Sequence, residues 1–195
     1  QPTVYTKEDT LLRNDAIHFF KQLPAEATTP ENELTAIKVN LGKILFYDTR
    51  LSKSGGNSCN TCHNLAGFGV DNEATSQGED GDFGERNSPT VFNAALHNMQ
   101  FWDGRAQTVE EQAGMPILNP HEMAIPHEGF LVDRLNQEKF YQDLFAAAFP
   151  EDKQALSYAN VQKAIGAFER TLLTPSSFDS FMEGNLGALD ATEKA

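Results

Sequence analysis

Apolar residues recur along most of the chain at the three- and four-residue spacing produced by one face of an α-helix. Between residues 34 and 45 they fall at i, i+3, i+7, i+10 and i+11. Thr29 and Pro30, followed by Glu31, predict that this helix begins directly after them. Further amphipathic helices are predicted over residues 12–23, 140–148 and 161–172. The pattern therefore predicts a mainly α protein with little or no sheet.

Residues 67–89 interrupt this periodicity. The stretch is rich in Gly, Asp, Glu and Ser and follows neither a helical nor a strand spacing. Loops of this length without regular structure are uncommon in compact domains, and they are usually functional or disordered. We therefore expect a long irregular loop in the middle of an otherwise helical chain.

The charge balance makes nucleic acid a poor partner. The chain of 195 residues carries 28 acidic and 15 basic residues, a net charge of -13, whereas phosphate contacts need clustered Lys and Arg. No apolar run approaches the roughly 20 residues of a membrane span. A signal peptide would show a basic segment followed by an apolar one, and the sequence has no such pattern. Gln1 in place of Met fits either a processed secreted protein or a trimmed chain.

The two cysteines of the chain, Cys59 and Cys62, stand directly before His63. This CxxCH pattern is the attachment motif of c-type haem. Two thiols on one helical turn can each form a thioether with a haem vinyl group, and the imidazole that follows can bind the iron. The motif predicts one covalently bound haem c with His63 as its proximal ligand. Because bacteria attach c-type haem in the periplasm, it also predicts a periplasmic protein.

Three other interpretations of the cysteine pair are weaker. A structural zinc site needs about four protein ligands, and one such pair supplies only two. A thioredoxin-like redox pair belongs to a βαβ context, which the helical pattern does not provide. A disulfide leaves His63 unexplained. The opposite face of the iron then decides the function, because an electron carrier fills that position and a peroxidase keeps it open beside an acid–base group.

Three long segments strongly resemble the bacterial dihaem cytochrome c peroxidases, which are related to the MauG-type dihaem enzymes. They read LGKILFYDTRLSKSGGNSCNTCHNLAGFG, RNSPTVFNAALHNMQFWDGRAQTVEEQAGMPILNPHEM and AIGAFERTLLTPSSFD. The resemblance covers the family's N-terminal peroxidatic domain, and it implies a cytochrome c-like helical haem domain with long irregular loops. Residues 1–195 would form this single domain, with about the first 40 residues as a helical extension packed on it. A second haem domain is expected after residue 195.

The resemblance also implies roles for individual residues. Glu122 stands where the family has its acid–base carboxylate, Gln112 where it has a distal amide, and Trp102 where an aromatic side chain carries electrons between the two haems. Asn87 matches a ligand of an interdomain calcium ion, whose other ligands come largely from the second half. Without the resemblance, the tryptophan would more often be a core aromatic, the glutamate a solvated carboxylate and the asparagine a turn residue.

The chain departs from the family in the loop after CxxCH. In most members this loop carries a histidine that binds the peroxidatic iron in the resting enzyme. The corresponding loop here, TSQGEDGDFGERNSPT, contains no His, and Glu79 stands in register with that ligand. We therefore expect an open distal position. The weaker candidates for a distal ligand are Glu79, Met115, Met123 and His121.

The expected function is reduction of hydrogen peroxide to water with electrons from a small cytochrome c or cupredoxin, delivered through the second haem. One alternative is a MauG-like oxidase that modifies a protein substrate through high-valent iron. Another is a monohaem electron carrier or ligand sensor, which the pairing of Glu122 with Gln112 disfavours. By analogy with the family, a homodimer is a further expectation.

Overall fold

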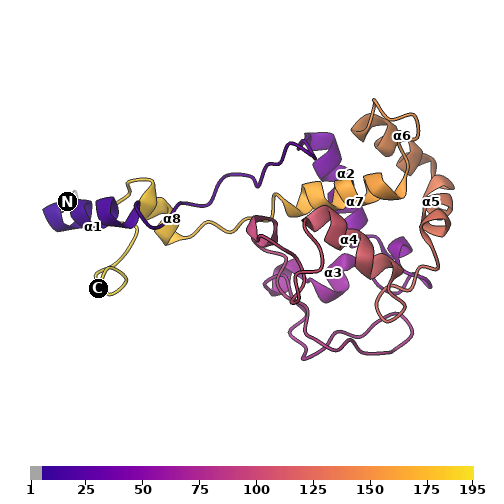
Figure 1. The fold of residues 1–195 in the computed structure, drawn as a ribbon, viewed down its shortest axis with the longest axis horizontal. Coiled ribbons are helices and arrows are strands. Elements are labelled where there is room, and N and C mark those ends of the chain that lie inside the picture. Colours follow the sequence, from indigo (N-terminus) through magenta and orange to yellow (C-terminus); the bar gives the residue numbers. More distant parts are fainter. Residues whose placement is uncertain (1–5) are drawn as a thin grey trace. The chain divides into compact units, whose positions relative to one another are not determined.

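The computed structural model of the protein describes residues 6–195, which form a mainly α structure (Figure 1). Within these residues the only β pairing consists of two isolated bridges. The predicted fold class is therefore confirmed. The regular elements are α1 (Lys7–Ala16), α2 (Ala36–Tyr47), η1 (Thr49–Leu51), α3 (Cys59–Cys62), η2 (Leu65–Gly67), η3 (Ala94–Leu96), α4 (Val109–Leu118), α5 (Glu128–Asn136), α6 (Lys139–Ala148), α7 (Tyr158–Glu169) and α8 (Ser177–Met182).

The chain divides into two compact units. The larger unit is Glu26–Leu172, and the smaller one joins the chain up to Ala25 to Leu173–Ala195. The expected single domain over 1–195, with its extension packed on it, stays a prediction. No helix among the described residues is long and apolar enough to cross a membrane.

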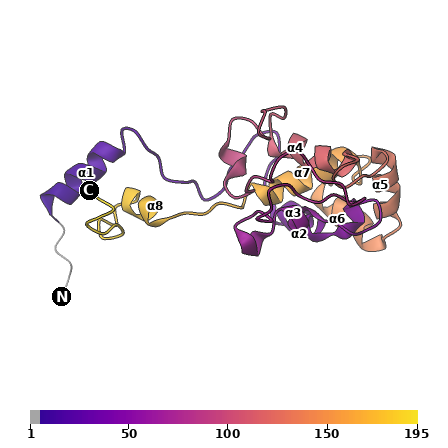
Figure 2. The same ribbon diagram turned by 90° about the horizontal axis from the view of Figure 1, so that it is seen from below.

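The core of the larger unit forms around α7, which has α2 on one side and α4 on the other (Figure 2). Gly42 lets α2 approach α7 closely, because a Cβ atom there would lie 1.8 Å from the Ala164 carbonyl oxygen. On the other side, the Tyr158 hydroxyl of α7 donates a hydrogen bond to the Gly114 carbonyl of α4. The largest fully buried core side chains are Leu41, Leu45, Phe46, Leu51, Ile117, Ile125, Leu131, Leu135, Tyr141, Phe145 and Ile165.

A buried ion pair fixes the register of α4 against the end of α7. The Arg170 guanidinium donates to both carboxylate oxygens of Glu110, at 2.7 and 2.9 Å, and to the Ala27 carbonyl at 3.0 Å. Both charged side chains are largely buried. Losing one partner would leave the other charge buried and unpaired, which typically costs about 3–5 kcal/mol.

The predicted start of the helix over residues 34–45 was wrong. α2 begins at Ala36, where the Thr35 hydroxyl accepts the Lys38 N–H at 3.2 Å as the N-cap. The residues after Thr29 serve a tertiary contact instead, because buried Asn32 donates to the Glu110 carboxylate at 2.8 Å. The helical signal of the Thr-Pro-Glu sequence was therefore overridden by packing.

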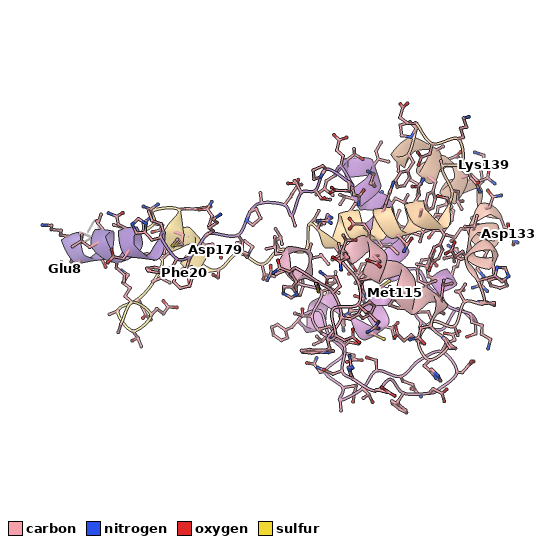
Figure 3. All side chains as sticks on the ribbon, viewed as in Figure 1. Glu8, Phe20, Met115, Asp133, Lys139 and Asp179 are labelled. Carbon is pink, nitrogen blue, oxygen red and sulfur yellow. The ribbon has the colours of Figure 1, made fainter. Side chains whose placement is uncertain are left out.

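The predicted helix over residues 12–23 was too long at its end, since α1 finishes at Ala16. The Leu23 N–H donates instead to the Asp179 carboxylate at 2.6 Å, which holds this part of the chain beside α8 (Figure 3). The ring of Phe20 packs edge-on against the ring of Phe178, with 5.7 Å between the ring centroids.

α6 confirms the helix predicted over 140–148, whereas α7 begins before residue 161 and ends before residue 172.

Residues 68–93 contain no helix or strand and follow a long irregular course beside α3 and α4 (Figure 1). The predicted central loop is therefore confirmed. Its irregular backbone is held by main-chain hydrogen bonds, such as those from Gly78 to Asp82 and from Val91 to Gly69. This segment forms part of the wall of the cavity described next.

Candidate functional site

The CxxCH segment forms a short helix of its own, α3. Its start is capped by Ser58, whose backbone N–H donates to the Thr61 hydroxyl at 3.0 Å. At its end the His63 N–H donates to the Cys59 carbonyl at 2.9 Å. Cys59 and Cys62 are both free thiols rather than a disulfide. The single turn brings both thiols and the imidazole to the wall of one cavity.

This cavity has a volume of about 1080 Å³. Small-molecule pockets typically measure roughly 300–1,000 Å³, so there is room for a large cofactor. The cavity is lined by α3, α4, the end of α7 and the irregular segment. The sequence-predicted residues along its wall are Cys59, Cys62, His63, Asn87, Trp102, Gln112, His121, Glu122 and Met123. Glu79 is not part of this lining, nor is Met115, which is 37% exposed on α4 (Figure 3).

The surroundings of His63 fit a haem ligand. Its Nδ1 is buried and has no hydrogen-bond partner within residues 6–195. Burial lowers the pKa of the ring, although the carbonyls of Gly69 and Pro89 favour the protonated form. A neutral imidazole is the form that binds a metal, and its second nitrogen usually donates to a carbonyl. The two carbonyls therefore offer acceptors for a ring N–H, while the other ring nitrogen would bind the iron.

The two thiols also fit covalent attachment better than metal ligation. Burial raises the pKa of Cys59. It also raises that of Cys62, although a hydrogen bond with Ser76 opposes the change. Zinc binds the thiolate form, which this burial disfavours. Addition to a vinyl group consumes a thiol and leaves a neutral thioether, which suits a buried position.

Glu122 is a half-buried carboxyl in the cavity wall. Its Oε1 accepts a hydrogen bond from the Asn119 side-chain amide at 2.8 Å. Burial raises the pKa of Glu122, against that hydrogen bond and the more distant charge of Arg105. A carboxyl with a raised pKa exchanges protons more readily near neutral pH than a solvated one.

Gln112 reaches the cavity because of its place on α4. Val109, Gln112, Ala113 and Pro116 recur at helical spacing, and all four line the cavity. Pro116 has no N–H to donate, so the helix lacks its usual bond to the Gln112 carbonyl. The distal amide predicted from the sequence therefore shares one wall with Glu122.

Trp102 lies at the rim of the cavity and is 61% exposed. Its indole N–H donates to the Asn87 main-chain carbonyl at 3.0 Å, so the two sequence-predicted residues are in contact. Next to it, the Arg105 guanidinium stacks on the Phe101 ring at 3.4 Å from the centroid. Asn87 as a calcium ligand stays a prediction, as does Trp102 as an electron route.

One cavity residue was missed by the sequence reasoning. Glu169, the last residue of α7, is 5% exposed and lines the cavity. Arg170, the residue after it, directs its guanidinium to the Glu110 carboxylate. Burial, and then the charge of Glu110, raise its pKa to about 8, although Arg170 opposes this. The cavity that this carboxyl lines is formed by segments distant in the sequence, so no local pattern identifies it.

Comparison with known proteins identifies the family of the chain. Residues 36–187 match the family model described as di-haem cytochrome c peroxidase. The chain belongs to this family. It is 44% identical over 192 residues to cytochrome c551 peroxidase of Pseudomonas aeruginosa, covering 94% of this chain and 55% of that protein. For cytochrome c551 peroxidase of Nitrosomonas europaea the identity is 46% over 173 residues, covering 87% and 49%.

The same family includes proteins with another name. The methylamine utilization protein MauG of Methylophilus methylotrophus is 37% identical over 176 residues, covering 90% of this chain and 52% of that protein. Among solved structures, a MauG-like protein associated with microbial copper homeostasis superposes with a TM-score of 0.76 at 31% identity, covering 85% of this chain and 49% of that one. The chain thus spans about half the length of the relatives it matches.

Proposed function

We propose that this chain is the peroxidatic haem domain of a di-haem enzyme that reduces hydrogen peroxide to water. The observation that carries the proposal is a shared cavity, in which Glu122 and Gln112 line the same space as the CxxCH residues. Membership of a peroxidase family supports it. Cys59 and Cys62 would hold the haem, and His63 would bind its iron.

The bound haem would supply the electrons and the Lewis acid that break the O–O bond. The protein supplies the proton transfers. Glu122 accepts the proton of one peroxide oxygen and returns it to the other, so that the leaving group is water. Gln112 orients the peroxide by hydrogen bonding. One peroxide, two electrons and two protons give two waters, and the carboxylate is regenerated in each cycle.

The distal position is proposed to be open at rest. The loop that carries a histidine ligand in most of the family has none here, and Glu79 in that register lies outside the cavity lining. Met115 also lies outside it, whereas Met123 and His121 contact the cavity. An open position would let peroxide react without prior reduction of the enzyme. A ferric spectrum with two axial histidines would contradict this.

The proposed electron donor is a small cytochrome c or cupredoxin, with a second haem domain and Trp102 on the route. A periplasmic location follows from haem c attachment. Calcium at Asn87 and a homodimer remain proposals from the family resemblance. The second candidate function is a MauG-like oxidase of a protein substrate, which the similarity to a MauG protein favours.

Replacing Glu122 tests the proposed function. In the haem-loaded protein, Glu122→Gln should slow the reaction of ferric haem with peroxide by about 100-fold or more, because general acid–base catalysis contributes about 10²–10⁴-fold. The haem spectrum should stay unchanged. Glu151→Gln, an exposed substitution, is the matched control. Rapid-mixing absorbance separates this step from donor oxidation. Equal rates in both variants would refute the role of Glu122.

A second measurement separates the two candidate functions. The full-length enzyme is mixed with peroxide and a reduced cytochrome c or cupredoxin, and donor oxidation is followed. Two equivalents of a one-electron donor oxidised per peroxide indicate a peroxidase. A fast peroxide reaction with no donor oxidation favours the protein-oxidising alternative.

A further inference from the structure

We propose that Glu79 is a positioning residue that anchors the loop of residues 76–84 and, through it, fixes the main chain of Glu122. The inference deepens the proposed function and rests on it for the role of Glu122. Glu79 would not touch the substrate. Its carboxylate would hold the loop from outside the cavity lining. In most of the family, the residue in this register binds the iron.

Glu79 joins two segments that are far apart in the sequence. Its main-chain N–H donates to the Glu122 carbonyl at 2.7 Å. Its Oε1 accepts the Ser54 N–H, and its Oε2 is buried with no hydrogen-bond partner among residues 6–195. A third hydrogen bond joins the same segments directly: the Lys53 N–H donates to the Met123 carbonyl at 2.8 Å. The segments before α3 and after α4 are thus connected to each other and to the loop.

The loop docks at this point with no space to spare. A Cβ atom on Gly78 would lie 2.0 Å from the His121 carbonyl oxygen and 2.7 Å from its carbonyl carbon. Contacts that close to main-chain atoms cannot be relieved by a side-chain rotation. The glycine therefore allows the main chain of the loop to lie directly against the residue before Glu122.

The anchor differs from the other charged contacts of the loop. Burial alone would raise the pKa of Glu79, but hydrogen bonding from Ser54 outweighs it and lowers the pKa. An ionised acceptor makes hydrogen bonds about twice as strong as a neutral one. By contrast, the Lys53–Asp80 and His121–Asp82 pairs are more than half exposed on both sides, and such pairs contribute little. Glu79 is thus the contact that should hold the loop.

Three variants of the haem-loaded full chain test this inference. Glu79→Ala removes the carboxylate, Glu79→Gln keeps an acceptor oxygen without the charge, and Asp80→Ala removes a neighbouring charge as the control. Amide hydrogen exchange over residues 76–84 should accelerate about 10- to 100-fold in Glu79→Ala, because hydrogen bonds to charged groups are the stronger ones. The exchange rate in Glu79→Gln should lie between those of the wild type and Glu79→Ala, and the rate in Asp80→Ala should match the wild type.

The second readout is the pH dependence of the peroxide reaction. A loosened loop admits water to Glu122, so the acid limb of the rate profile should move to lower pH in Glu79→Ala and stay in place in Asp80→Ala. Gly78→Ala disturbs the same docking without changing charge and should reproduce both effects. Exchange rates in Glu79→Ala equal to those of the control would overturn the inference. If exchange responds but the wild type does not reduce peroxide, the anchor stands and the proposed function fails.

Discussion

Replacing Glu169 by Gln should make the stability of the protein less dependent on pH. The Glu169 carboxyl is buried, and its pKa is raised to about 8. In the unfolded chain the same group ionises near its ordinary value of about 4.3. Between these two values the folded state binds the extra proton, so the free energy of unfolding falls as pH rises and levels off above about pH 8.

The size of the effect follows from the two pKa values. Each pH unit between them costs about 1.4 kcal/mol, which gives roughly 3–4 kcal/mol at pH 7 and about 5 kcal/mol above pH 8. Gln has nearly the same shape but cannot ionise, so it removes this loss and keeps a polar group in place. At pH 4 the two proteins should differ by about 1 kcal/mol or less, because both then carry a neutral side chain.

Urea unfolding of the haem-loaded protein, followed by far-ultraviolet circular dichroism at pH 4, 7 and 9, measures the difference. Other titrating groups change both proteins alike, so the comparison isolates Glu169. Glu110 and Arg170 also influence the pKa of Glu169, so neither of these two residues is substituted in this comparison. Glu151→Gln removes an exposed carboxylate as the control. If the difference between wild type and Glu169→Gln is the same at pH 4 and pH 9, the reasoning is refuted.

Three further substitutions test the packing and the site. Gly42→Ala should destabilise the protein by about 2 kcal/mol or more in thermal unfolding, since its Cβ would overlap the Ala164 carbonyl. Gly129→Ala is the control: its Cβ would lie 3.4 Å from its nearest neighbour, so this substitution should be neutral or stabilising in the same assay. Arg170→Met should cost about 3–5 kcal/mol in urea unfolding by leaving Glu110 unpaired; a loss below 1 kcal/mol would contradict it. Asn119→Ala removes a bond that lowers the pKa of Glu122, so the acid limb of the peroxide rate should move to higher pH; an unmoved limb would count against Glu122 as the titrating group.

Sequence patterns predicted the parts of the fold that are locally determined. The helical spacing of Tyr141, Leu144, Phe145 and Ala148 matches α6 because that face of the helix packs on the core. The start of α2 could not be found this way, since Asn32 is held by Glu110, 78 residues away. α4 and α5 were not predicted at all. In α4 the apolar pattern is short and is interrupted by Gly114 and Pro116, so the sequence alone does not indicate a helix there.

The candidate site divides in the same manner. The CxxCH residues are readable from sequence because their chemistry depends on spacing within one turn. Glu122 and Gln112 were named through the family resemblance, and the structure places both in the cavity wall. The direction of the Glu79 side chain was not predictable, because it depends on a contact with Ser54, 25 residues earlier. Glu169 was missed for a similar reason, since helical periodicity marks its position as buried without showing that a cavity lies there.

Two of the carboxyls that line the cavity, Glu122 and Glu169, have environments that suit different tasks. Glu122 is half-buried and hydrogen-bonded to Asn119, which opposes the effect of burial on its pKa. Burial raises the pKa of Glu169 to about 8, so that carboxyl is largely neutral at pH 7. A neutral acid cannot accept the first proton of peroxide, whereas a carboxylate can. Of the two, Glu122, with its opposing hydrogen bond, is therefore the one we expect to accept the first proton, and Glu169 would stay a neutral part of the wall throughout the cycle.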